Sequence, residues 1–153
     1  MKLHRIVGGS LEKLQNKEYQ IGVGISLGNK WFTVDNIVSL TKWCLDYSSD
    51  KVIVYVADEI HAINLEVRKE ITKEKAGRLA DELGNKILDE VQNELKKVLS
   101  EVEYKRIIFA KWKDLTDEEF KGKVSWLYSK YQNDLDFKND IEGMVKEMVS
   151  NEI

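Results

Sequence analysis

Short apolar runs alternate with segments of helical periodicity along most of the chain. Residues 19–26 (YQIGVGIS) are apolar and stop at a turn-forming Gly-Asn pair, which predicts a buried strand followed by a tight turn. Thr33 then precedes apolar residues at helical spacing, which predicts a capped helix. Residues 51–57 (KVIVYVA) are rich in β-branched side chains, as expected of a strand covered on both faces of a parallel sheet. These segments predict a βαβ unit.

The second half of the chain continues the alternation. Residues 58–71 show no clear period, and we expect them to begin as a polar loop. A long helix follows, then a third strand at residues 105–110 (KRIIFA), and Thr116 with Glu119 has the spacing of a capping box that opens another helix. The apolar stripe of the long helix is predicted to contain Ala76, Leu79, Ala80, Leu83, Ile87, Val91, Leu95 and Val98. A last helix from about Asp134 is predicted to present to the core Phe137, Ile141, Met144, Val145, Met148 and Val149.

The resulting order, β-α-β-α-β-α-α, predicts an α/β fold with a Rossmann-like parallel sheet flanked by helices. No proline, repeat or Gly/Ser-rich linker marks an internal boundary, so residues 1–153 are predicted to form a single domain. Ligands bind outside the carboxyl ends of the strands in sheets of this kind. The segments to consider are therefore residues 26–29, 58–61 and 111–113.

Composition narrows the functional classes. The formal net charge is -3, so an RNA contact would need a local basic surface rather than a basic protein. No apolar run approaches the length of a bilayer span, and Cys44 is the single cysteine, which excludes an intramolecular disulfide. We therefore expect a cytoplasmic protein that does not cross a membrane.

Ser26 is the strongest candidate for chemistry. It lies in the string Gly24-Ile25-Ser26-Leu27-Gly28, where a glycine-flanked turn at the end of a strand exposes the hydroxyl and directs backbone N–H groups toward an oxyanion. An isolated Gly-x-Ser-x-Gly more often forms only a turn. An α/β-hydrolase would also need a histidine late in the chain, whereas both histidines lie in the first half. A small serine esterase is kept only as an alternative.

Asp58, Glu59 and His61 follow the second predicted strand at its ligand-facing end. Three potential ligands within four residues cannot converge from one turn, and no cluster of histidine or cysteine completes a shell, so no metal site is predicted. His61 is retained as a candidate base for Ser26. The four tryptophans are predicted to pack in the core and receive no role in the site.

The longer string from Ile21 to Thr33, IGVGISLGNKWFT, resembles the nucleophile motif of tRNA-dependent cyclodipeptide synthases. That motif is an apolar strand, then Gly-x-Ser-x-x-Asn, then an aromatic residue followed by Ser or Thr. The resemblance extends through the following helix, the segment VIVYVADEIHAIN, the long helix and the strand near IIFA. It implies a Rossmann-like fold similar to the catalytic domain of class I tyrosyl-tRNA synthetases. It also implies an enzyme that makes a cyclic dipeptide from two aminoacyl-tRNAs.

The resemblance assigns roles to several residues. Ser26 would attack the ester of the first aminoacyl-tRNA and carry its aminoacyl group. Asn29 would help to arrange the turn, where an asparagine also tolerates a left-handed backbone. Gly24, Gly28 and Asp58 are expected to line the substrate site. Because the substrates arrive already activated, no cofactor is expected.

The family contacts tRNA through a basic face of the long helix, where cationic side chains bind phosphate. The residues of this sequence that match this face are Lys73, Lys75, Arg78 and Lys86. They are interleaved with acidic residues, a pattern typical of a solvated helix with i,i+4 pairs. We therefore expect aminoacyl-tRNA as the partner, bound through a diluted basic surface.

Family members are longer than this chain. After the region matching residues 144–151 they carry a catalytic tyrosine and glutamate, and then a Tyr-His or Tyr-Pro pair. The resemblance therefore implies a C-terminally shortened relative. One alternative is a non-catalytic relative that binds aminoacyl-tRNA or another protein. Apolar surface left by the missing segment predicts a homodimer.

Overall fold

The computed structural model describes the backbone of residues 9–150 and the side chains of residues 9–146. The chain divides into two compact units, of which the first ends at Leu115 and the second begins at Thr116. The elements in chain order are α1 Leu11–Gln15, β1 Tyr19–Ile25, α2 Val34–Tyr47, β2 Ser48–Val56, α3 Asp58–Lys69, α4 Lys73–Val98, α5 Glu101–Tyr104, β3 Ile107–Lys111, the 3-10 helix η1 Trp112–Leu115, α6 Glu118–Asn133 and α7 Leu135–Ser150.

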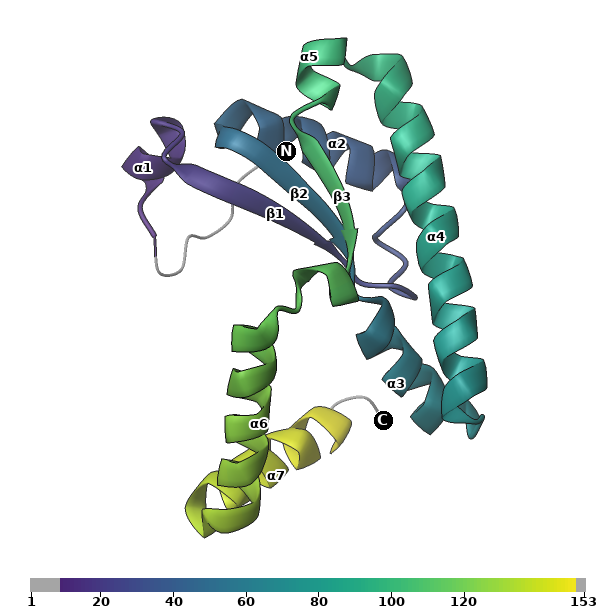
Figure 1. Ribbon diagram of the computed structural model, residues 1–153, viewed down its shortest axis with the longest axis vertical. Coiled ribbons are helices and arrows are strands. Elements are labelled where there is room, and N and C mark those ends of the chain that lie inside the picture. Colours follow the sequence, from purple (N-terminus) through teal and green to yellow (C-terminus); the bar gives the residue numbers. More distant parts are fainter. Residues whose placement is uncertain (1–8, 151–153) are drawn as a thin grey trace. The chain divides into compact units, whose positions relative to one another are not determined.

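The first unit is built on a three-stranded parallel sheet with the strand order β1-β2-β3 (Figure 1). α2 connects β1 to β2, and α4 lies in the connection from β2 to β3. Right-handed crossovers that step twice in the same direction across a sheet place both connections on one face. α2 and α4 accordingly pack on the sheet and on each other. The predicted class, a Rossmann-like parallel sheet flanked by helices, is confirmed.

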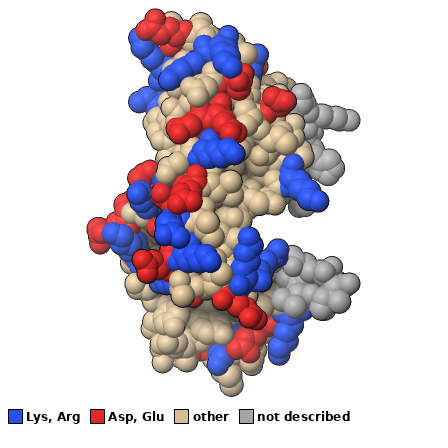
Figure 2. All heavy atoms as spheres, turned by 90° about the vertical axis from the view of Figure 1, so that its right-hand side faces the viewer, with Lys and Arg blue, Asp and Glu red and all other residues tan. Residues whose placement is uncertain are grey.

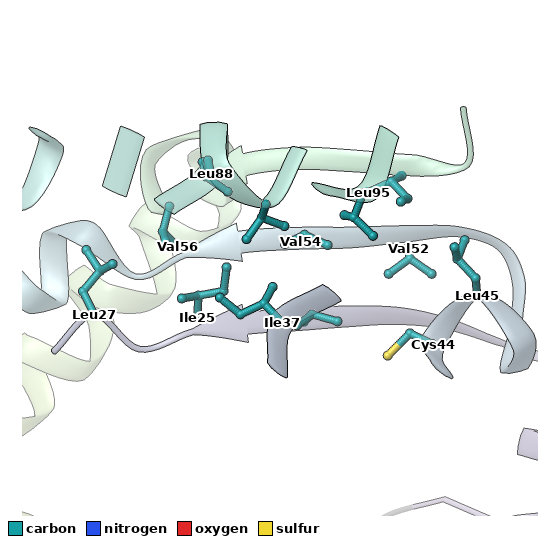
Figure 3. Close-up of a cluster of buried hydrophobic side chains, with 13 residues drawn as sticks. Ile25, Leu27, Ile37, Cys44, Leu45, Val52, Val54, Val56, Leu88 and Leu95 are labelled. Carbon is teal, nitrogen blue, oxygen red and sulfur yellow. The ribbon is translucent and has the colours of Figure 1, made fainter. Parts of the chain in front are cut away.

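The core lies between the sheet and these two helices. Val52, Val54 and Val56 of β2 are fully buried, because alternate residues of a strand point to the same face. Figure 3 shows these valines in one cluster with side chains of β1, α2 and α4. Cys44 of α2 belongs to this cluster, and its burial raises the pKa of the thiol to about 11. The single cysteine is therefore a packing residue.

The opposite face of the sheet is only partly covered. Tyr55 of β2 is half-buried, and Ile108 of β3 is 40% exposed. On β1 this face carries Gly22 and Gly24 in place of large side chains. The prediction that the second strand is covered on both faces is therefore wrong for this face.

Helix α4 is confirmed, but its buried stripe differs from the predicted one. The buried residues are Ala76, Ala80, Gly84, Leu88, Val91 and Leu95. Leu83, which the pattern assigned to the core, is 40% exposed, and Val98 is 49% exposed. The stripe passes through Gly84 because the absence of a side chain lets α4 approach the end of β2. A Cβ atom on Gly84 would lie 3.6 Å from Val56 Cγ2 and 3.6 Å from Asp58 Cβ.

Residues 58–69 form helix α3, and the prediction of a polar loop there is wrong. The preceding residue, Ala57, offers no side-chain cap, and the helix has no buried apolar residue, so two features that commonly accompany a helix are missing. Acidic residues in the first turn and basic residues in the last turn match the helix dipole. Packing against α4 completes the stabilisation.

The second unit is a hairpin of α6 and α7. Asp117 caps α6, since its Oδ1 accepts a hydrogen bond of 2.8 Å from the backbone N–H of Phe120. The predicted capping box at Thr116 is therefore one residue early. The hydroxyl of Tyr131 donates to Glu142 Oε1 at 3.0 Å and joins the two helices.

Much of the apolar surface of this hairpin is exposed. Met144 and Val145 were predicted to face the core but are 61% and 53% exposed, whereas Phe137 and Ile141 are half-buried. The side chains predicted at positions 148 and 149 lie outside the described residues. No helix within residues 9–150 is both long enough and apolar enough to cross a membrane.

The buried stripe predicted for α4 contains Leu83, whereas the observed stripe contains Leu88, so the two stripes give opposite expectations for alanine substitutions at these positions. Replacing Leu88, which is 7% exposed, with alanine should cost about 2–4 kcal/mol of the free energy of unfolding, because it empties part of the core. Leu83→Ala should cost about 1 kcal/mol or less. Urea titrations of the two variants and the wild type measure both values. Equal losses, or a larger loss in Leu83→Ala, would contradict the observed packing.

Candidate active site

Ser26 follows β1 directly and is exposed at the carboxyl end of that strand. The chain then turns, with the Asn29 N–H donating to the Ser26 carbonyl at 3.3 Å. Gly28 has a φ of 83°, a conformation that glycine adopts without strain. Alternation along β1 places Ser26 on the same face as Gly24. The turn therefore presents an accessible hydroxyl on the partly covered face of the sheet.

Asn29 holds the turn with its side chain. Its Oδ1 accepts a hydrogen bond of 2.9 Å from the Trp31 N–H, and Asn36 Nδ2 donates to the Trp31 carbonyl at 2.7 Å. Among the described residues the left-handed conformation occurs at Lys17, Gly28 and Glu70, so it does not explain Asn29. The Trp31 side chain was predicted to pack in the core, but it is 47% exposed.

Tyr55 is a residue of this face that the sequence analysis missed. It pairs with Gly24 of β1, where a Cβ atom would lie 2.8 Å from the Tyr55 hydroxyl oxygen. A Cβ atom on Gly22 would lie 3.6 Å from the ring, so the phenol covers both glycines. The Trp112 ring lies beyond it, with 6.4 Å between ring centroids. The sequence feature that could have indicated Tyr55 is a pair of alternate glycines in one strand with an aromatic residue in the next strand.

Asp58 begins α3 at the carboxyl end of β2 and is buried, with 6% of its surface exposed. Its Oδ1 accepts a hydrogen bond of 3.1 Å from the backbone N–H of Trp112, the first residue of η1. The carboxylate therefore connects the ends of β2 and β3. Its expected contact with substrate stays a prediction.

His61 lies in the first turns of α3, next to the serine turn. A Cβ atom on Gly28 would lie 3.0 Å from His61 Cε1, and the imidazole forms a hydrogen bond with the Leu27 backbone. Burial, followed by the charge of Lys69, lowers the pKa of His61 below its usual value, and the hydrogen bond to Leu27 opposes this shift. The ring is therefore mainly neutral near neutral pH.

An ion pair lies at the carboxyl end of β3. Lys111 Nζ pairs with Asp81 of α4, and the Lys111 side chain is only 13% exposed. The hydrogen bond from Lys111 lowers the pKa of the Asp81 carboxyl. The positive charge of Lys111 is thus largely neutralised within the protein.

The basic face predicted on α4 is balanced by acidic residues. Arg78 lies 3.9 Å from Glu82, and Lys86 lies 4.0 Å from Glu90, both as i,i+4 pairs. The helix carries six basic and six acidic residues. Figure 2 shows the two signs interleaved over the face that α4 presents. The structure therefore does not bring the predicted tRNA-binding residues together as a purely basic patch.

Lys73 and Lys75 lie in the first turn of α4, whose N-terminus is capped by Thr72. Lys73 lines a groove of about 410 Å³ between α3 and α4. Glu59 and Glu66 line the same groove, so its charge is mixed. Among the described residues, no three His, Cys, Asp or Glu side chains are arranged to hold a metal ion.

The family model of cyclodipeptide synthases matches residues 8–153, which is almost the whole chain. The chain belongs to the cyclodipeptide synthase family. No curated protein matches its sequence.

Solved cyclodipeptide synthases share the fold at low sequence identity. A protein of Mycobacterium tuberculosis, whose structure relates these enzymes to type I tRNA synthetases, is 16% identical with a TM-score of 0.70, and the match covers 90% of this chain and 60% of that one. A synthase from Fluoribacter dumoffii is 14% identical with a TM-score of 0.71, covering 94% and 63%. AlbC from Streptomyces noursei is 20% identical with a TM-score of 0.62, covering 86% and 61%. The chain spans about three fifths of the length of these synthases.

The role of Asp58 can be tested by its effect on stability. Asp58→Ala removes the acceptor of the Trp112 N–H and should cost about 1–3 kcal/mol. Asp58→Asn keeps an Oδ1 acceptor and should cost less. Urea unfolding followed by circular dichroism measures both. If Asp58→Ala is as stable as the wild type, the carboxylate does not connect the two strand ends.

Proposed function

We propose that this chain is the nucleophile-bearing part of a tRNA-dependent cyclodipeptide synthase, and that Ser26 accepts the aminoacyl group of an aminoacyl-tRNA. The observation that carries the proposal is the exposed serine at the carboxyl end of β1, on the partly covered face of the sheet, in a chain of this family. Ligands bind at this end of parallel strands.

The first step is a transesterification that moves the aminoacyl group from the tRNA to Ser26. The Ser26 oxygen attacks the carbonyl carbon of the aminoacyl ester, and the bond from that carbon to the ribose oxygen of the tRNA breaks. The serine proton ends on the leaving ribose oxygen. Because the substrate is already activated, positioning and oxyanion stabilisation by backbone N–H groups of the turn are the main contributions required of the protein. The amine of the Ser26-bound aminoacyl group then attacks the ester of a second aminoacyl-tRNA, which forms a dipeptidyl-enzyme and releases the second tRNA. The free amine of the dipeptide attacks the Ser26 ester, which closes the ring and frees the serine, and no cofactor is needed.

The neighbouring residues suit this reaction. Gly22 and Gly24 let the Tyr55 phenol pack flat on the strand that ends at Ser26, so an aromatic surface lies next to the serine. We therefore propose that the aminoacyl group lies beside Ser26 and against the Tyr55 phenol, which itself covers Gly24. Asn29 fixes the course of the turn through its hydrogen bond to Trp31.

The tRNA is proposed to bind along α4 through Lys73, Lys75, Arg78 and Lys86. The pairs of Arg78 and Lys86 with glutamates are highly exposed, with 69% and 71% of the two basic side chains accessible. Exposed pairs of this kind contribute only about 0–1 kcal/mol. Phosphate groups can therefore replace the glutamates as partners.

A second candidate function is a relative that binds aminoacyl-tRNA or another protein without catalysing the reaction, and the balanced charge of α4 favours the protein partner. Self-association as a homodimer stays a prediction. It is supported by the exposed apolar side chains of the second unit, among them Trp126, which is 61% exposed. The small serine esterase also stays an alternative, for which turnover of a simple activated ester is the test.

Acylation of Ser26 is the test of the proposed function. The protein is incubated with a mixture of charged tRNAs, and its intact mass is measured. We expect an added mass equal to one aminoacyl group in the wild type and no such mass in Ser26→Ala. Ser39→Ala, which changes an exposed serine of α2, is the matched control and should be acylated like the wild type.

Three outcomes separate the candidates. An adduct that needs Ser26 supports the synthase. Absence of an adduct, combined with binding of charged tRNA, overturns the proposed acylation and favours the binding protein. Hydrolysis of p-nitrophenyl acetate that is lost in Ser26→Ala, without acylation from tRNA, favours the esterase.

A further inference from the structure

We propose that His61 is a positioning residue for Ser26, whose ring braces the serine turn from helix α3. The inference rests on the proposed acylation of Ser26 and adds a residue outside the nucleophile motif. It starts from two contacts of the imidazole, one at Gly28 and one at the Leu27 backbone.

The two contacts lie one and two residues beyond the nucleophile. The position of a Gly28 Cβ would be 3.0 Å from His61 Cε1, closer than a side chain can normally approach, so the ring packs directly on the glycine backbone. The imidazole also lies within hydrogen-bonding reach of the backbone of Leu27, the residue before Gly28. The Leu27 side chain is buried in the core, at 9% exposure. The turn is therefore held from the core by Leu27 and from α3 by His61.

The ring is itself carried by a well-anchored segment. The His61 N–H donates to the Ala57 carbonyl at 3.0 Å, which places the histidine in the first hydrogen-bonded turn of α3. The start of that turn, Asp58, is connected to η1 through the Trp112 N–H and packs close to Gly84 of α4. A brace mounted on rigid elements can hold a reacting group within a fraction of an ångström.

The contacts favour positioning over proton transfer. The imidazole contacts Leu27 and Gly28, which follow Ser26 in the turn. The closeness at Gly28 also explains why the turn needs a glycine there in addition to its φ of 83°. The glycine and the histidine thus specify one geometry of the turn together.

The functional arm of the test compares His61→Ala with the wild type in single-turnover acylation of Ser26. We expect the rate constant at saturating aminoacyl-tRNA to fall on the order of 10-fold, because a small displacement of a nucleophile is costly. The half-saturating concentration of aminoacyl-tRNA should not change. His61→Gln should recover part of the rate, since its amide can donate to the Leu27 carbonyl. Asn64→Ala, an exposed change on the same helix, is the control and should match the wild type.

A second arm measures the turn itself by amide hydrogen exchange. The Asn29 amide, which donates to the Ser26 carbonyl, should exchange faster in His61→Ala than in the wild type. The Val52 amide, which donates to Arg106 in the sheet, should be unchanged. If the wild type is not acylated at all, the proposed function fails, and this arm still decides the role of His61.

Two results would overturn the proposed positioning role of His61. One is a wild-type acylation rate in His61→Ala. The other is unchanged exchange of the Asn29 amide in that variant.

Discussion

The burial of strand β2 on a single face is the constraint on which the rest of the structure depends. Val52, Val54 and Val56 are fully buried against α2 and α4, and each such side chain contributes about 1.5–3 kcal/mol. Both crossover helices lie on that face, so the other face is left to the glycines of β1 and to Tyr55. A slip of one residue in β1 would turn Ser26 toward the core helices. Core packing and the exposure of the serine are therefore two results of one register.

The order of strands and long helices could be predicted from the sequence, because apolar periodicity reports directly which residues are buried. The predictions were wrong where burial does not follow the apolar pattern. The stripe of α4 passes through Gly84, which has no hydrophobic signal, and so the pattern assigned Leu83 to the core in place of Leu88. Helix α3 has neither a cap at Ala57 nor a buried apolar residue. Its acidic first turn and basic last turn can be read from the sequence, whereas its packing against α4 is a property of the folded chain.

Some residues of the candidate site could be predicted from the sequence, and others could not. Ser26 and Gly28 were predictable because a strand that ends in a glycine turn is a local feature. Tyr55 and His61 reach the site from other elements, one through the register of β1 with β2 and the other through the course of α3. Neither relation is present in a local pattern. The dilution of the basic surface of α4 was predictable, because Arg78 and Lys86 pair with glutamates four residues further along the same helix.

The central claim is that one packing arrangement buries Cys44 and exposes position 26. Alkylation tests it directly, because iodoacetamide reacts with accessible thiolates. Under native conditions at about pH 8, Ser26→Cys should take up one label quickly, whereas the wild type should remain unlabelled until it is unfolded, since Cys44 is 2% exposed and its thiol has a pKa of about 11. If the thiol introduced by Ser26→Cys is as protected as Cys44, the serine does not lie on the open face and the account is wrong.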